Sequence, residues 1–271
     1  MFGRSFYHST LRKYVITFGN MFNGIYVQRF NQNDERIQTL KVPIAYGPKE
    51  KFLVRASQDP DLNQAIAISL PRIGFEMTGL SYAPARKLPS LQKNVKASAT
   101  DPNAYISQYR PVPYDIQFQM SIFVRNADDG TQIVEQILPY FQPEWTNNIN
   151  LIPELNLAYD VPCVLNDVSM EDSYQGDFET RRAIVYTLSF TMKGYIFGPI
   201  STSGFIKRTE LNFISSSGFQ DVLSAGETRT SVITPGLTAA GQPTSDPTLS
   251  VDYRQIDSDD DYGFAKSINE Y

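Results

Sequence analysis

Few side chains in this 271-residue chain could support catalysis. The single histidine, His8, would need a distant nucleophile and an orienting carboxylate to act as a general base. The single cysteine, Cys163, follows a proline in an apolar run, which favours a buried structural thiol over a reactive one. One histidine and one cysteine cannot supply a tetrahedral zinc site from soft ligands. No Gly-x-Ser-x-Gly elbow, phosphate-binding loop or dinucleotide-binding motif occurs.

Carboxylates are denser in two places, where they could hold a divalent cation or act as acid and base. The first runs from Glu154 to Glu179 and includes Asp160, Asp167, Glu171, Asp172 and Asp177. These acids fall at predicted turns and strand ends, where solvated side chains are expected. The second comprises Asp257, Asp259, Asp260 and Asp261. It begins like a calcium loop, but Tyr262 replaces the required glycine and Ile268 the final glutamate. We therefore predict no catalytic residue, no metal site, no cofactor and no enzyme.

The remaining charged feature is the basic segment Pro84–Thr100, which contains no acid. Its four cations are Arg86, Lys87, Lys93 and Lys96. They indicate either contact with a DNA backbone or an acidic protein, or a solvated connection. The net charge of −5 falls entirely after Ala225, so the body is neutral, which disfavours tight nucleic-acid binding. We take these four cations and the four aspartates of residues 257–261 as candidate interface residues that pair between subunits.

The strongest structural pattern lies between Tyr109 and Trp145. Six alternate apolar residues in Tyr114–Val124 predict a strand with one buried face. After the polar turn Asn126–Gly130, Ile133–Phe141 has helical spacing, with Asp128 or Asp129 as the predicted cap. Pro139 should end this helix near Leu138.

Other segments complete a sheet-rich plan, and hydrophobic residues at 41% suffice for a core. A helix is predicted over Ser9–Met21, capped by Ser9 or Thr10. It is expected to dock on the core, although the acid-free N-terminus also fits a transit peptide or a membrane-surface helix. Strands are predicted over residues 24–30, 36–45, 49–56, 67–83, 151–159, 161–170 and 181–197. The fold class is thus α+β, a mixed, mainly antiparallel sheet flanked by an N-terminal and a central amphipathic helix. Residues 1–210 should form a core domain and 211–271 an extended acidic arm.

Several segments together are similar to those of a known family. They are MFGRSFYHSTLRKY, VPIAYGPKEKF, LPRIGFEM, SIFVRNADD, IVEQILPYFQP and RRAIVYTLSFTMKGYIFGP, which cover most of residues 1–200 in order. With them the chain resembles the tail sheath stabiliser and completion proteins (tail terminators) of T-even-type contractile-tail phages.

The resemblance implies a structural virion protein without enzymatic activity, assembled in the host cytoplasm and located in the phage neck. It implies a homo-hexameric ring that caps the tail tube and sheath, ends tail assembly and offers a head-to-tail joining surface. The implied partners are further copies of the chain, the sheath protein, the tube or tube-terminator protein, the head-completion proteins, and double-stranded DNA passing through the lumen. No membrane is implied. The alternative hypothesis is a nucleic-acid-binding neck connector that uses the basic segment 84–100.

Overall fold

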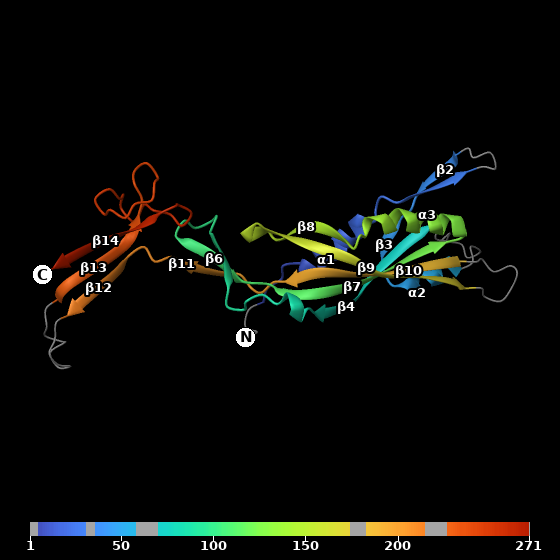
Figure 1. The fold of residues 1–271 in the computed structure, drawn as a ribbon, viewed down its shortest axis with the longest axis horizontal. Helices are drawn as coiled ribbons and strands as arrows, with labels where there is room; N and C mark the ends of the chain where they lie inside the picture. The colour runs from blue at the N-terminus through green and yellow to red at the C-terminus, as the bar shows by residue number, and fades with distance from the viewer. Residues whose placement is uncertain (1–4, 31–35, 58–69, 174–182, 215–226, 271) are drawn as a thin grey trace. The chain divides into compact units, whose positions relative to one another are not determined.

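The computed structural model describes residues 5–30, 36–57, 70–173, 183–214 and 227–270. Its elements are α1 (Thr10–Met21), β1 (Tyr26–Phe30), β2 (Arg36–Lys41), β3 (Ile44–Tyr46), α2 (Lys49–Ser57), β4 (Arg72–Tyr82), η1 (Pro84–Arg86), β5 (Lys93–Ala97), β6 (Ala104–Tyr109), β7 (Val112–Val124), α3 (Ala127–Ile137), η2 (Leu138–Tyr140), β8 (Glu144–Ile152), η3 (Pro153–Leu155), β9 (Leu157–Ser173), β10 (Ala183–Ile196), β11 (Ser201–Gly204), β12 (Thr209–Ile214), β13 (Glu227–Gly236) and β14 (Gly263–Glu270). Figure 1 shows their arrangement.

The chain folds as two compact units. Unit 1 comprises Met1–Ser90 and Arg110–Phe197, and unit 2 comprises Leu91–Tyr109 and Gly198–Tyr271. Residues 91–109 are therefore an excursion out of unit 1 that joins the C-terminal segment. The domain boundary predicted after residue 210 falls inside β12. The segment predicted as an extended arm contains β13 and β14, which pair with each other.

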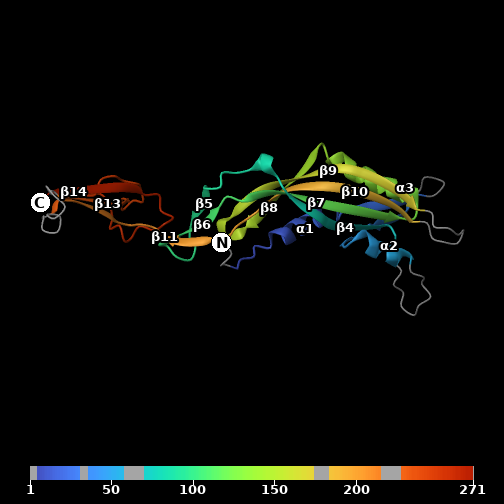
Figure 2. The ribbon, with the colours of Figure 1, turned by 90° about the horizontal axis from the view of Figure 1, so that it is seen from below.

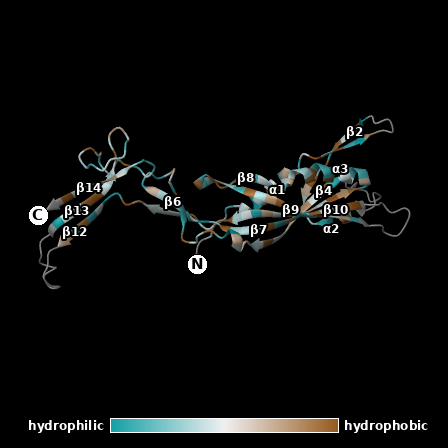
Figure 3. Ribbon diagram, viewed as in Figure 1, coloured by the Kyte–Doolittle hydropathy of each residue, from teal (hydrophilic) through white to brown (hydrophobic). Residues whose placement is uncertain are grey.

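Unit 1 is built on a six-stranded mixed sheet of order β3-β4-β7-β10-β9-β8. Only β3 and β4 run parallel, and the other neighbours are antiparallel. The long strands β7 and β10 are in register from Ile184 opposite Val124 to Ile196 opposite Val112. The predicted alternation in both strands is confirmed, because their apolar side chains on one face are buried. Figure 3 displays the resulting bands of hydropathy along the strands.

Helix α1 docks on this buried face, as predicted, and can be followed against the sheet in Figure 2. The Phe18 ring stacks on Phe118 at a centroid distance of 4.4 Å and meets Phe190 edge-on at 5.2 Å. Ser9 occupies the N-cap position but its side chain makes no capping hydrogen bond. The Tyr14 hydroxyl accepts from the backbone N–H of Tyr195 and donates to its carbonyl, which holds α1 onto β10.

Two predictions for segments that the structure shows as helices were wrong: the strand predicted over residues 49–56 and the cap predicted for α3. Residues 49–56 were predicted as a strand, but they lie in α2 (Lys49–Ser57), which packs on the opposite face of the sheet. There Phe52 forms a small core with Phe123 and Val185, so tertiary packing outweighs the short apolar run. Asp128 and Asp129 lie in the first turn of α3, where Asn126 is the N-cap residue. Asp129 instead forms an ion pair with Arg29. Helix α3 ends at Ile137, as Pro139 predicted.

Unit 2 contains two three-stranded antiparallel sheets, β11-β6-β5 and β12-β13-β14. Strand β5 lies within the basic segment predicted as a connection. A turn at residues 257–260 joins the C-terminal segment to β6 through hydrogen bonds to Pro102 and Ala104. The buried apolar side chains described in this unit are those of Ala104, Pro235, Ile256 and Ala265.

Candidate interface

Arg86, the first candidate interface residue, is engaged within unit 1. Its Nη2 donates to the Asp115 carboxylate at 2.6 Å and to the Tyr114 carbonyl at 3.1 Å. Its Nη1 donates to the Gly194 carbonyl at 3.4 Å, and the guanidinium lies 5.3 Å from the centre of the Tyr195 ring. Arg86 thus ties η1 to β7 and β10. These contacts give the residue a packing role, while its predicted interface role remains a prediction.

The three candidate lysines are exposed. Lys87 follows η1 in unit 1, whereas Lys93 and Lys96 lie on β5 in unit 2. The Lys93 ammonium lies 4.7 Å from the centre of the Tyr109 ring, its partner across the β5–β6 pair. None of the ion pairs within the described part of the chain involves these lysines. They are therefore available to a partner.

The four candidate aspartates form a turn in unit 2. The Asp260 carboxylate accepts from the backbone N–H of Asp257 at 2.8 Å, so it stabilises the turn itself. Ser258 anchors the turn to β6, because its N–H donates to the Pro102 carbonyl and its hydroxyl to the Ala104 carbonyl. Asp259 and Asp261 are exposed. In the described ranges no group of three potential metal-ligating side chains occurs, here or elsewhere.

Strand β6 brings the basic strand and the acidic turn into the same unit. Strand β5 pairs with β6 from Lys93 opposite Tyr109 to Ala97 opposite Tyr105, and the acidic turn bonds to residues just before and at the start of β6. Unit 2 thus carries both signs of charge on separate elements. Their predicted pairing between subunits remains a prediction.

Among the described residues, the others singled out in the sequence form no reactive group. Cys163 is fully buried on β9, and burial raises the pKa of its thiol to about 12, so the predicted structural thiol is confirmed. His8 lies just before α1, with its ring 5.4 Å from that of Phe6. Among the acids, Glu171 pairs with Lys49 at 2.7 Å. Asp160 accepts from the amide of Asn148 at 2.7 Å. Asp177 and Glu179 lie outside the described residues.

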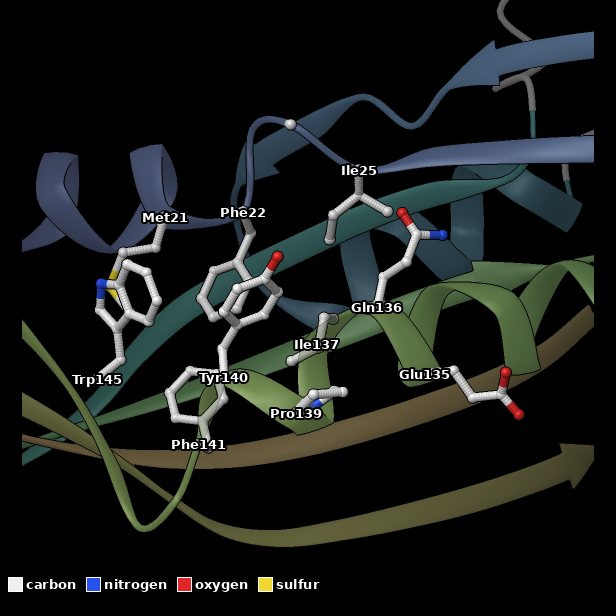
Figure 4. A pocket seen from close by; sticks show the side chains of 11 residues that line it. Met21, Phe22, Ile25, Glu135, Gln136, Ile137, Pro139, Tyr140, Phe141 and Trp145 are labelled. Atoms are coloured by element: carbon white, nitrogen blue, oxygen red, sulfur yellow. The ribbon is translucent and has the colours of Figure 1, made fainter.

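A groove of about 470 Å³ lies in unit 1 between the end of α1, the start of β1, α3–η2 and β8 (Figure 4). Its lining comprises Met21, Phe22, Gly24, Ile25, Glu135, Gln136, Ile137, Pro139, Tyr140, Phe141 and Trp145. The Tyr140 and Trp145 rings meet edge-on at 5.4 Å. With Glu135 and Tyr140 as its titratable side chains, the groove offers aromatic surface and no pair of nucleophile and base.

One polar arrangement was not predicted. Two glutamines of α3 pair with the backbone of β1 in the way a neighbouring strand would. The Gln132 side-chain amide accepts from the N–H of Gln28 and donates to its carbonyl, both at 3.0 Å. Gln136 does the same at Tyr26, at 3.4 and 2.8 Å. The spacing of Asp129, Gln132 and Gln136 places three polar side chains on one helix face. This spacing is the feature of the sequence that could have indicated a polar contact made by that face.

Comparison with known proteins identifies the family. Residues 5–266 match the model of the T4-like virus Myoviridae tail sheath stabiliser. The chain is also 32% identical over 224 residues to the tail completion protein gp15 of Enterobacteria phage T4, with 79% of each chain covered. The chain belongs to the T4-like tail sheath stabiliser family. The match includes both units, so unit 2 is part of the family's fold.

Membership confirms the resemblance predicted from the sequence. The proteins matched are structural components of phage tails, which supports the prediction that the chain is not an enzyme. Within the part of the chain that the structure describes, no helix is long and apolar enough to span a bilayer.

Proposed function

We propose that this chain forms a ring at the top of the phage tail, stabilises the sheath, ends tail assembly and offers the joining surface for the head. The observation that carries the proposal is the family match, which extends from residue 5 to residue 266 across both units. The related protein of phage T4 is called a tail completion protein. The assigned partners are copies of the chain, the sheath protein, the tube or tube-terminator protein and the head-completion proteins, with DNA passing through the lumen.

The charge distribution supports an assembly role. In a closed ring each subunit offers two different complementary patches to its neighbours. Exposed Lys93 and Lys96 on β5 and exposed Asp259 and Asp261 in the acidic turn provide opposite charges that no ion pair within the described residues uses. We assign these residues to contacts between subunits or with tail partners. We also expect a homo-hexamer, which is the state that the resemblance to the family implies.

Electron microscopy of the purified full-length chain tests the ring. We expect a six-fold ring whose pore is wide enough to admit duplex DNA. The double variant Lys93→Glu, Lys96→Glu should weaken ring or tail assembly, and the neutral variant Lys93→Gln, Lys96→Gln should weaken it less. Monomers under all conditions, with and without tails, would contradict the ring.

The alternative function, a nucleic-acid-binding neck connector, draws on exposed Lys87, Lys93 and Lys96. Arg86 weakens this alternative because its guanidinium is already bonded within unit 1. Phosphate contacts would make the affinity for duplex DNA fall steeply with salt. Fluorescence anisotropy with a labelled duplex at low salt separates the two functions. The ring proposal expects weak binding, whereas tight, salt-sensitive binding lost in the Lys→Gln variants would favour the connector.

A further inference from the structure

The β1–β2 hairpin has one closed and one open backbone edge. In an antiparallel pair, opposite residues alternate between hydrogen-bonded and non-bonded pairs. Gln28 is opposite Thr39 and Tyr26 is opposite Lys41. Because the N–H and C=O groups of Gln28 and Tyr26 bond to Gln132 and Gln136, they point away from β2. The pairs with Thr39 and Lys41 are therefore non-bonded pairs, and the backbone groups of these two residues point outward from β2.

Helix α3 closes the edge of β1 completely enough to exclude another strand there. The two glutamine amides use the outward backbone groups at residues 26 and 28, and the Arg29–Asp129 ion pair at 2.7 Å fixes the next position. No hydrogen bond among the described residues reaches the outward groups of Thr39 or Lys41. Figure 1 shows the hairpin, labelled at β2, standing out from the rest of unit 1. Among the residues that the structure describes, the edge of β2 is thus held in place and unpaired.

The side chains around this edge indicate the chemistry of an incoming strand. Three large apolar side chains of the hairpin are exposed, Tyr26 to 46%, Phe30 to 53% and Ile37 to 67%. Exposed Arg36 and Lys41 stand at the two ends of β2, which carries no acid. Charges on an edge strand also discourage unwanted pairing. Here, however, they leave uncharged Thr39 at the centre, beside exposed apolar surface. An extended segment with apolar and acidic side chains is complementary to this edge.

We propose that β2 accepts an extended, acidic segment of a tail sheath subunit as a third strand of the hairpin sheet. The proposal rests on the proposed function for the identity of the partner, and it adds the surface and the mode of binding. Backbone hydrogen bonds to Thr39 and Lys41 would give the affinity, and Arg36 and Lys41 would select the acidic partner. The anchored glutamine pairs keep the hairpin in register while the outer strand binds.

A proline at position 39 tests the edge directly. Thr39→Pro removes an outward N–H and leaves the bonds between β1 and β2 intact, because residue 39 belongs to a non-bonded pair. The matched control, Thr39→Val, keeps the N–H and nearly the same side-chain shape. We measure co-sedimentation of the full-length chain with assembled sheaths of the same virus. Thr39→Pro should bind at least about fivefold more weakly, from the lost hydrogen bond and the clash of the ring with the incoming strand. Thr39→Val should bind like the wild type.

Hydrogen exchange on the wild type supplies a test that does not depend on the stability of a variant. The amides of Thr39 and Lys41 should exchange several-fold more slowly in the sheath-bound state than in the free protein. The double variant Arg36→Glu, Lys41→Glu should weaken binding to the sheath, whereas Arg36→Gln, Lys41→Gln should weaken it less. Unchanged exchange at both amides, or equal binding by Thr39→Pro and wild type, would overturn the strand-addition proposal while the sheath-stabilising function stood.

Two other outcomes separate the proposals. If the wild-type chain neither binds nor stabilises sheaths, the proposed function itself is wrong. If Thr39→Pro disrupts self-association of the purified chain in the absence of sheath, and Thr39→Val does not, the edge binds a second copy and the sheath assignment is overturned. Sedimentation velocity of the two variants at equal concentration distinguishes this result from loss of the fold, which far-UV circular dichroism monitors.

Discussion

Units 1 and 2 are stabilised by different kinds of contact. Unit 1 buries a cluster of aromatic rings under α1, in which Phe18 touches Phe22, Phe75, Phe118 and Phe190 at centroid distances from 4.4 to 5.3 Å. In the described part of unit 2, the buried apolar side chains are one isoleucine, one proline and two alanines, Ile256, Pro235, Ala104 and Ala265. Several of its large apolar side chains, such as Phe213 and Phe264, are exposed. Unit 1 can therefore fold around its own core, whereas unit 2 depends more on polar contacts.

The polar contacts of unit 2 join segments that are distant in the sequence. Ser107, Gln108, Thr230, Ser231 and Ser258 are buried there. The Gln108 amide donates to the Gly198 carbonyl at 2.7 Å, and Ser258 bonds to Pro102 and Ala104. A hydrogen bond contributes about 0.5–1.5 kcal/mol net, less than a buried aromatic ring. Unit 2 thus exposes apolar side chains, which our proposed function assigns to contacts with partners in an assembly.

The largest expected effect contrasts one phenylalanine from each unit. Phe18→Ala removes a fully buried ring and should lower the free energy of unfolding by about 3–5 kcal/mol. Phe264→Ala removes a ring that is 69% exposed and should change it by no more than about 0.5 kcal/mol. Urea unfolding followed by the fluorescence of Trp145, the single tryptophan, reports on unit 1. Far-UV circular dichroism reports on the whole chain. If the two variants lost comparable free energy of unfolding, the two units would not differ in how much their aromatic side chains stabilise them.

A smaller effect tests how closely unit 1 is packed. Gly130 lies in the first turn of α3, and a Cβ there would clash with the ring of Tyr186 and approach Val124 Cγ2 to 3.1 Å. Alanine normally stabilises a helix relative to glycine by about 1 kcal/mol. The clash with Tyr186 should outweigh this gain in helix stability, so Gly130→Ala should lower the free energy of unfolding by about 1–3 kcal/mol. Tyr186→Leu, Gly130→Ala should recover part of this loss. A more stable Gly130→Ala variant in thermal unfolding would show that the packing is looser.

Sequence periodicity predicted the regular parts of unit 1 and failed where packing or distant pairing decided the structure. Strands β7 and β10 were predicted because one face of each is continuously buried, which produces an alternation that Phe123 and Val185 interrupt. Helix α2 was missed because its apolar residues are few, and Phe52 is fixed by Phe123 and Val185 from distant strands. Strands β13 and β14 were missed because their buried positions are mostly small or polar, such as Thr230, Ser231 and Gly236, so hydropathy gives them little pattern.

The charges of the candidate interface were predictable from the sequence, but the contacts that its residues make within the fold were not. Exposed Lys93 and Lys96 follow from a basic stretch without acids. Nothing in the local sequence distinguishes them from Arg86, which is bonded to Asp115 and stacked near Tyr195. The glutamine pairs on β1 depend on a contact more than 100 residues away. Such contacts require the topology, which local periodicity does not contain.

Adjacent residues Arg86 and Lys87 offer a matched comparison within unit 1. Arg86→Gln loses the ion pair with Asp115 and the bond to the Tyr114 carbonyl, and we expect a loss of about 1–2 kcal/mol. Lys87→Gln removes an exposed charge and should be within about 0.5 kcal/mol of the wild type. Denaturant unfolding of the two variants decides between a packing and an interface role. If Arg86→Gln is as stable as wild type but assembles poorly, the interface role predicted from the sequence is favoured.

The smallest expected effect lies in unit 2 and depends on pH. The hydroxyls of Tyr105 and Tyr262 are 2.9 Å apart, and burial together with this hydrogen bond raises the pKa of Tyr105 from 10.0 to about 12. The folded state therefore keeps a proton that the unfolded state releases near pH 10. The stability from this group is complete below pH 10 and is lost as the pH rises through about 12.

Tyr105→Phe should lower the free energy of unfolding by less than about 1 kcal/mol at pH 8, because one neutral hydrogen bond is lost. The difference from wild type should shrink between pH 10 and pH 12, where the wild-type tyrosine loses its advantage. Burial also raises the pKa of Tyr14 in unit 1, so both proteins should lose stability at alkaline pH. The difference in the free energy of unfolding between the wild type and Tyr105→Phe therefore reports on the tyrosine pair of unit 2 alone. Parallel pH profiles for the two proteins, measured by urea unfolding with circular dichroism, would show that the tyrosine pair does not stabilise this unit.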